Sequence, residues 1–350
     1  MSPGAMGAGL SIKQPAMQPS LMIGVTASGI VDHDPNIDVD TKFKLAKASD
    51  VFDYIDRTPP PAELDQHAAA ALKYQIPIRA GGFFYTLGRD EPLLDWHLRI
   101  SRSLGIQVHN VQIRARDATG ELVSNERVAQ TYLWCAELGD KYGTSPSFEV
   151  HINMWSEHFG RVEEVGLLVE RHGVPFNITL DHSHVIFKID NSREQDVLGM
   201  RPDVESGKIV LDPFRERNIT QQWISANWVR HAHARPASPA NPVNIWATHP
   251  DGSFGRGVQY PFLEPQPGEW HSPWDPRKLE PWKEVIRQLL RHHASHPESR
   301  LQTISLEMIP NIDYGAGAKY SIWENNVACA KWIRSEWHKT LDGSIAAAQR

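Results

Sequence analysis

The sequence is poor in cysteine, in long apolar runs and in clustered positive charge. Its 350 residues include only two cysteines, Cys135 and Cys329, which excludes a disulfide scaffold and a zinc-ribbon site. Both cysteines lie in apolar helical patterns, so we expect buried free thiols. No segment reaches the roughly 18 consecutive apolar residues of a membrane-spanning helix. We therefore predict no membrane partner and a cytoplasmic location.

The charge balance argues against nucleic acid as a partner. The 42 Asp and Glu residues outnumber the 36 Lys and Arg residues, for a formal charge of −6, and no long basic run occurs. A protein that neutralises many phosphates needs such a run. The residue types in excess are instead histidine, with 17 copies, and tryptophan, with 12. The histidines fit either a metal site or simple scatter, and their positions along the chain distinguish the two.

The chain divides into a short arm and one domain. Residues 1–20 are small, proline-containing and aperiodic, which predicts a flexible N-terminal arm. From 21 to 342, apolar strand patterns alternate with helical ones, which indicates βαβ units and a parallel sheet. The predicted strands cover 21–27, 51–55, 77–84, 106–113, 148–153, 176–181, 228–234 and 303–308. Eight such units favour an α/β fold, the closed (β/α)₈ TIM barrel.

Two connections in this barrel are unusually long. They follow the sixth and seventh predicted strands and cover 185–227 and 235–280. The first contains a charged stretch in which short helices are expected, and the second is rich in proline. Both leave the carboxyl ends of strands, which is the face where the active sites of TIM barrels form. Long loops in a compact domain are usually functional.

Polar residues fall at the ends of four successive strands. Glu149, His151 and Asn153 alternate along the fifth strand and so share one face, as His231 and His233 do on the seventh. Asp181 ends the sixth strand and Glu307 the eighth. Carboxylates crowded at one end of a barrel repel one another unless a cation joins them. Mostly oxygen ligands with one imidazole favour Mn²⁺, with Mg²⁺, Co²⁺ or Zn²⁺ as alternatives.

This order of residues resembles the xylose-isomerase-like TIM barrels. The order is Glu on strand five, Asp-x-x-His on strand six, His-x-His on strand seven and Glu on strand eight. The resemblance implies the metal ligands Glu149, Asp181, His233 and Glu307. It also implies a substrate-binding role for His184 and a place near the substrate for Arg235.

A narrower resemblance concerns two short segments. Residues 148–157, FEVHINMWSE, and 255–262, GRGVQYPF, are similar to the large subunits of bacterial C-glycoside deglycosidases. Those proteins act on 3-oxo-glycosides and pair with a small β-rich subunit. The resemblance therefore implies a sugar or glycoside substrate and either a homo-oligomer or a complex with a small second subunit.

The sequence departs from the epimerase pattern at strand two. The epimerases that it resembles use a second glutamate there as the other catalytic base, and this sequence has none directly after residues 51–56. Asp53 and Asp56 are weak substitutes, and His151 is the better candidate for proton transfer because its pKa lies near working pH. We therefore expect the catalytic residues His151, Glu149 and Glu307. The expected substrate-binding residues are Asn153, His184, His231, Arg235, Trp155 and Arg256. Loop tryptophans are a further candidate for stacking on the substrate: Trp246, Trp270 and Trp274.

These residues predict removal of a proton next to a carbonyl, with a metal that stabilises the enolate. Return of the proton gives a sugar isomerase or epimerase. Loss of a group β to the enolate gives a lyase that cleaves 3-oxo-glycosides, or one that resembles dehydroshikimate dehydratase. A non-catalytic scaffold subunit is a further alternative. An endonuclease-type phosphodiesterase is disfavoured, since it requires a larger metal set and a basic groove.

Overall fold

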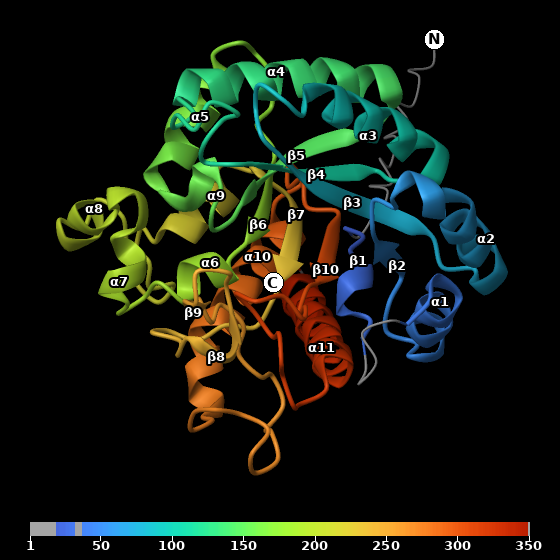
Figure 1. Ribbon diagram of the computed structural model, residues 1–350, viewed down its shortest axis with the longest axis vertical. Coiled ribbons are helices and arrows are strands. Elements are labelled where there is room, and N and C mark those ends of the chain that lie inside the picture. Colours follow the sequence, from blue (N-terminus) through green and yellow to red (C-terminus); the bar gives the residue numbers. More distant parts are fainter. Residues whose placement is uncertain (1–18, 32–36, 349–350) are drawn as a thin grey trace, which may run out of the picture.

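The structure is a computed structural model that describes residues 19–31 and 37–348. Most of the predicted arm, residues 1–18, lies outside the described residues. Eight parallel strands form a closed barrel in the order β1-β10-β7-β6-β5-β4-β3-β2 (Figure 1). The strands are β1 Met22–Thr26, β2 Tyr54–Asp56, β3 Ile78–Tyr85, β4 Val108–Ile113, β5 Ser145–Val150, β6 Ile178–Asp181, β7 Val229–Ala234 and β10 Thr303–Leu306. The predicted TIM barrel is confirmed.

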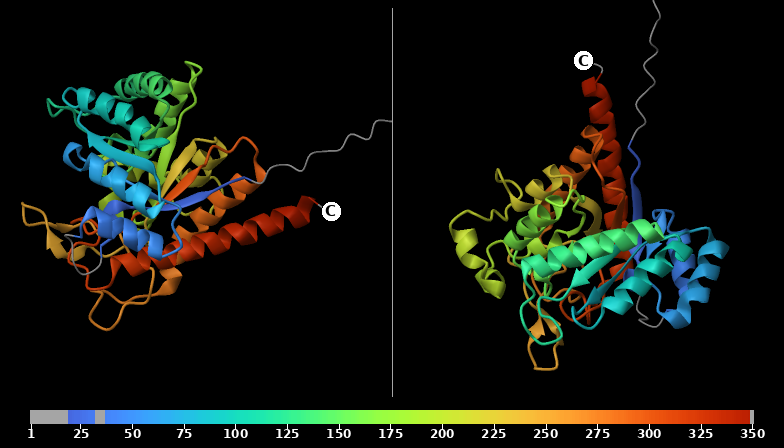
Figure 2. Two further views of the ribbon diagram at one scale, coloured as in Figure 1. Left: turned by 90° about the vertical axis from the view of Figure 1, so that its right-hand side faces the viewer. Right: turned by 90° about the horizontal axis from the view of Figure 1, so that it is seen from above.

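Helices connect successive strands and cover the outside of the barrel. The main ones are α1 Val39–Ala48, α2 Leu64–Tyr74, α3 Glu91–Leu104, α4 Asn125–Tyr142, α5 Gly160–Glu170, α10 Glu280–Ser295 and α11 Ile322–Ala348. The local sequence fixes α4 at both ends: Ser124 Oγ accepts from the Arg127 N–H at its start, and Gly143 ends it at a φ of 75°. Helix α11 continues past the other helices (Figure 2). None of the described helices is long and apolar enough to cross a membrane.

The two faces of the strands differ in chemistry. Side chains that point toward the helices, such as Val111, Phe148 and Leu180, belong to the apolar core. The barrel interior is polar instead. Tyr54 crosses it and bonds to Ser305 Oγ at 2.8 Å, while a Cβ added at Gly24 would lie 2.4 Å from the Tyr54 ring. The apolar layer therefore holds the fold together, and the interior presents polar groups to the barrel mouth.

The two long connections carry structure of their own. As expected, the connection after β6 contains short helices: α6 Ser183–Ile186, α7 Ser192–Gln195, α8 Arg201–Glu205 and α9 Ile219–Ser225. The connection after β7 contains an antiparallel strand pair that the sequence analysis missed, β8 Asn244–Thr248 and β9 Phe254–Gly255. Its proline content concealed the short strands, which pair with each other outside the barrel.

Candidate metal and substrate site

Four acidic and imidazole side chains converge at the mouth of the barrel. Glu149 comes from β5, Asp181 from β6 and His233 from β7, and Glu307 directly follows β10. Each offers one ligand atom, and the four atoms all lie within 4.8 Å of one another. His233 Nδ1 lies 2.8 Å from Glu149 Oε1 and 2.9 Å from Glu307 Oε2. We call these four residues the carboxylate cluster.

Negative charge dominates this cluster. Arg235 donates from Nη1 to Asp181 Oδ2 and from Nη2 to Glu307 Oε2, both at 2.6 Å. Burial opposes ionisation of Asp181, but Arg235 and His184 hold its pKa well below the usual range. Burial also disfavours a charged His233, but Glu307 and Glu149 raise its pKa well above the usual value. The site thus attracts positive charge, and three carboxylates with one imidazole are a donor set that fits a divalent cation.

A second layer of polar groups holds the cluster in place. Asn110 Nδ2 donates to Glu149 Oε2 at 2.7 Å. Asp56, at the end of β2, lies 3.4 Å from His233 Nε2 and 3.2 Å from His231 Nε2 through its Oδ2. Burial works against the ionised Asp56, yet hydrogen bonds from these two histidines lower its pKa. The sequence singled out Asp56 only as a weak substitute for a strand-two glutamate.

The expectation that His231 binds substrate is wrong in this structure. Its side chain is fully buried inside the barrel, and its Nδ1 bonds to Thr303 Oγ1 at 2.8 Å while its Nε2 faces Asp56. Two residues along a strand displace a side chain by more than 6 Å along the barrel. His231 therefore lies one layer below His233, away from the mouth.

His151, His184 and Tyr314 form a contact group beside the cluster. His151 Nδ1 lies 2.5 Å from the Ile152 carbonyl oxygen, and Tyr314 Oη lies 3.0 Å from His151 Nε2. The rings of His151 and His184 are 4.2 Å apart between centroids, and His184 Nε2 lies 3.0 Å from Asp181 Oδ2. Burial, then the proximity of His184, lowers the pKa of His151 to about 4. The imidazole is therefore neutral near pH 7.

Tyr314 was missed by the sequence analysis, because it lies in a loop after the last strand with no pattern around it. Its ring centroid is 4.1 Å from the guanidinium carbon of Arg235. Tyr314 thus contacts both the neutral histidine and the cation of the site.

The predicted fifth strand, 148–153, lies three residues too far along the chain, because the strand covers Ser145–Val150. It ends at Val150, and Asn153 has a φ of 63°, so His151 and Asn153 do not continue the strand alternation from Glu149. Both still line the cavity described below. Trp155 does not: it is 0% exposed within the apolar core, because the turn after β5 directs it inward. The prediction that Trp155 contacts substrate is therefore wrong in this structure.

The Arg256 side chain forms ion pairs with buried carboxylates. Its guanidinium bonds to Glu157 and to Glu194, and Lys188 Nζ lies 3.0 Å from Glu157 Oε1. These four side chains join the loops after β5, β6 and β7, and we call them the loop cluster. Burial alone would raise the pKa of Glu157, but Lys188 and Arg256 lower it to about 2. The guanidinium joins these loops, because its donors bond to Glu157, Glu194 and Asn153 Oδ1. The role of Arg256 in substrate binding stays a prediction.

A cavity of about 550 Å³ lies at the barrel mouth, and Glu307 is the member of the carboxylate cluster that lines it. Its lining includes Arg114, His151, Arg235, Glu307 and Tyr314. Cavities of this size hold small-molecule ligands. Arg235 also lines it, and its guanidinium is bound to Asp181 and Glu307. His184 is fully buried behind His151 and is not among the residues lining the cavity.

The loop tryptophans lie outside this cavity. Trp246 and Trp270 pack edge to face at 5.7 Å between centroids, and Trp274 Nε1 donates to the Pro261 carbonyl oxygen at 3.0 Å. Their aromatic surface anchors the loop after β7. They do not line this cavity, and their stacking on substrate stays a prediction.

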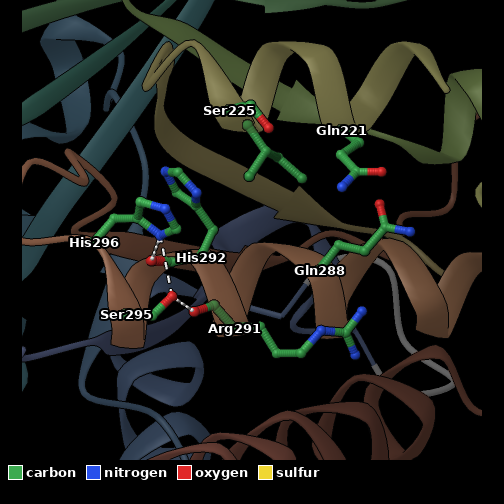
Figure 3. Close-up of a pocket in the computed structure, with 8 residues that line it drawn as sticks. Gln221, Ser225, Gln288, Arg291, His292, Ser295 and His296 are labelled. Carbon is green, nitrogen blue, oxygen red and sulfur yellow. Dashed lines mark hydrogen bonds between the residues drawn. The ribbon is translucent and has the colours of Figure 1, made fainter. Parts of the chain in front are cut away.

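Another hollow of about 260 Å³ lies between α9 and α10 (Figure 3). Its histidines bond within the protein, with His292 Nε2 at 2.6 Å from Asn227 Oδ1 and His296 Nδ1 at 3.1 Å from the His292 carbonyl oxygen. The residues it takes from α10 belong to the C-terminal half of that helix, which leads to the start of β10. The hollow therefore lies toward the end of the barrel opposite the carboxylate cluster.

No protein-family model matches the sequence, and no curated protein matches it. Solved structures do match. A D-allulose 3-epimerase from Methylomonas sp., in complex with D-allulose, has a TM-score of 0.52 at 11% identity, over 91% of this chain and 98% of that one. A 3-DHS dehydratase from Bacillus anthracis, described as probable, has a TM-score of 0.54 at 12% identity, over 89% and 98%.

A third structure is a xylose isomerase-like TIM barrel protein from Mycobacterium smegmatis in complex with magnesium. It has a TM-score of 0.51 at 8% identity, over 93% of this chain and 98% of that one. At such identities the likeness concerns the fold alone. Together with the closed parallel barrel, it shows that the chain has the fold of the xylose isomerase-like TIM barrels.

Proposed function

We propose that the protein is a divalent-metal-dependent enzyme that removes a proton next to a carbonyl of a carbohydrate. The observation that carries this proposal is the carboxylate cluster, whose four ligand atoms lie within 4.8 Å of one another at the barrel mouth. Glu149, Asp181, His233 and Glu307 would hold the metal, and Mn²⁺ is the ion we expect. A divalent metal supplies Lewis-acid stabilisation of a developing oxyanion.

His151 is the proposed base. Its Nδ1 faces a backbone carbonyl oxygen and so carries the proton, which leaves Nε2 with a lone pair toward Tyr314. In the proposed step, the Tyr314 hydroxyl releases the Nε2 lone pair, which takes the proton from the carbon next to the carbonyl. The C–H electron pair forms the carbon–carbon double bond of the enolate, and the carbonyl π pair moves to the carbonyl oxygen. The imidazole is neutral for this purpose, as the lowered pKa requires.

The remaining groups orient the reacting partners. Tyr314 holds the His151 ring by its hydroxyl and meets Arg235 by its ring face. Asn153 and Arg235 line the same cavity and complete the proposed substrate contacts. Return of the proton to carbon gives isomerisation or epimerisation. Loss of a group β to the enolate gives elimination, as in cleavage of a 3-oxo-(C-)glycoside or in a dehydroshikimate-dehydratase-like reaction.

The experiment is a comparison of substrates with protein loaded with Mn²⁺. Free ketoses and 3-oxo-glycosides are incubated in D₂O, and the products are followed by NMR. Exchange of the α-proton for deuterium that ceases after chelation and returns with Mn²⁺ is the expected result. Turnover that persists at full rate in chelated protein would show the metal proposal to be wrong. No exchange with either substrate class, or with its carboxylated or phosphorylated counterparts, would favour the alternative, a non-catalytic scaffold subunit.

The cytoplasmic location, the homo-oligomer and the small second subunit stay predictions. Light scattering on the purified chain tests the homo-oligomer, and the expected result is a mass of at least two chains of 39.5 kDa each.

A further inference from the structure

Arg114 lies on the wall of the cavity, directly after β4. It lines the same cavity as His151 and Glu307. Its guanidinium carbon is 4.4 Å from the centroid of the Phe84 ring, which in turn stacks on Phe83 at 4.6 Å. The side chain is half-buried. An aromatic face therefore holds this cation at a fixed place in the cavity wall.

The other ionised groups of this wall already have partners. Arg235 is bound to Asp181 and Glu307, and Asp313 Oδ1 accepts from His249 Nε2 at 2.7 Å. Among the residues that the structure describes, Arg114 has no hydrogen-bond acceptor and no ion-pair partner for its guanidinium. Removing a cation from water without an anion is costly, and the Phe84 ring offsets only part of that cost.

A nearby arginine shows the contrast. Arg116 is exposed, and its Nη1 donates to the Gly120 carbonyl oxygen at 2.8 Å. Arg114 instead keeps its planar set of N–H donors free inside a cavity. This fork matches a carboxylate or a phosphate, to which it can donate two parallel hydrogen bonds.

We infer that Arg114 binds an anionic group of the substrate, so that the substrate is a sugar acid or a sugar phosphate rather than a neutral sugar. The inference rests on the proposed function, because it places the anion in the cavity that Glu307 of the carboxylate cluster and His151 line. The cavity volume of about 550 Å³ accommodates a monosaccharide with one such group. A carboxylate and a phosphate share the required chemistry, and the experiment separates them.

The test measures three dissociation constants by calorimetry on the Mn²⁺-loaded protein, for D-glucose, D-glucuronate and D-glucose 6-phosphate. We expect one of the anions to bind at least about tenfold more tightly than glucose, and Arg114→Gln to remove that advantage. Arg116→Gln is the matched control and leaves all three constants unchanged. Arg114→Lys keeps most of the advantage if the anion is a phosphate, and loses it if a carboxylate needs the fork.

Failure of this inference is distinct from failure of the proposed function. Anions that bind no more tightly than glucose, including no measurable binding of any probe, overturn the role of Arg114. An equal loss in Arg116→Gln does the same. A Mn²⁺ titration of the same protein tests the metal site separately: if Mn²⁺ does not bind while the Arg114-dependent anion preference persists, the proposed function fails and this inference stands.

Discussion

Two clusters of buried charge lie near the mouth of the barrel, and they differ in balance. The loop cluster pairs two carboxylates, Glu157 and Glu194, with two cations, Lys188 and Arg256. The carboxylate cluster has three carboxylates, and Arg235 is the permanent cation that contacts two of them. In a cluster with equal numbers of positive and negative side chains, the charges compensate one another. A cluster with an excess of negative side chains favours binding of a further cation. The difference separates a structural role from a ligand-binding one.

Burial and charge attraction oppose each other in the loop cluster. Burial lowers the pKa of Lys188 even though Glu157 and Glu194 favour its charged form. Taking both partners out of water thus offsets much of their attraction. Removal of one member leaves its buried partner without an opposite charge, which lowers the free energy of unfolding. Because the members come from three different loops, such a loss affects the packing of all three.

The largest expected effect is therefore on stability, from breaking the balanced cluster. Glu157→Gln leaves Lys188 and Arg256 with too little negative charge, and we expect a loss of about 3–5 kcal/mol in the free energy of unfolding. Urea denaturation followed by circular dichroism measures it. Glu163→Gln, at an exposed position of α5, is the control and changes stability by less than about 0.5 kcal/mol. Equal stabilities of the two variants would contradict the structural role.

Low pH should also destabilise the fold through Glu157, by less than the Glu157→Gln substitution does. The folded-state pKa of Glu157 is about 2, below its ordinary value of 4.5. The unfolded chain thus binds this proton more readily, and the stabilisation of about 3 kcal/mol is complete above pH 4.5 and is lost as the pH falls toward 2. Denaturation of wild type and Glu157→Gln between pH 7 and pH 2 measures it. We expect the gap between them to narrow over this window, and a constant gap would count against the lowered pKa.

The carboxylate cluster should respond to metal instead. At a free Mn²⁺ concentration of about 100 times Kd, the wild type gains about 2.7 kcal/mol of unfolding free energy. Glu149→Gln and Asp181→Asn are expected to lose this gain, whereas Glu157→Gln keeps it despite its lower baseline. Glu121→Gln, at an exposed loop position, is the control. Metal-induced stabilisation that survives in both ligand variants would place the metal elsewhere.

The smallest expected effect comes from the second layer. Asn110 orients Glu149 through a single hydrogen bond of 2.7 Å. Asn110→Ala should weaken Mn²⁺ affinity about 10–100-fold while the fold stays intact, because such neighbours orient the ligand and tune its basicity. Calorimetric titration gives the affinity. Gln107→Ala, exposed just before β4, serves as its control, and an equal loss there would indicate a nonspecific effect.

The strand pattern was sufficient to predict the barrel and the residues at its mouth. Period-two alternation fixes which side chains face inward, so the sequence alone assigns Glu149, His233 and Glu307 to the barrel interior. Asp181 and Glu307 were also predictable because parallel strands end at a common face. Errors began where the strands ended: the fifth strand was extended to Asn153, and Trp155 was given to the substrate.

What tertiary structure alone decided was the set of partners. Tyr314 reaches His151 across 163 residues, and Asp56 reaches His231 across 175. Arg256 bonds to Glu157 and Glu194, and within 19–31 and 37–348 the Arg114 guanidinium contacts the ring of Phe84. Local periodicity determines the direction of a side chain on a strand. It does not determine which side chains a loop residue contacts, because barrel closure and loop packing set those distances. An arginine therefore forms ion pairs or keeps its donors available for a ligand according to the residues around it.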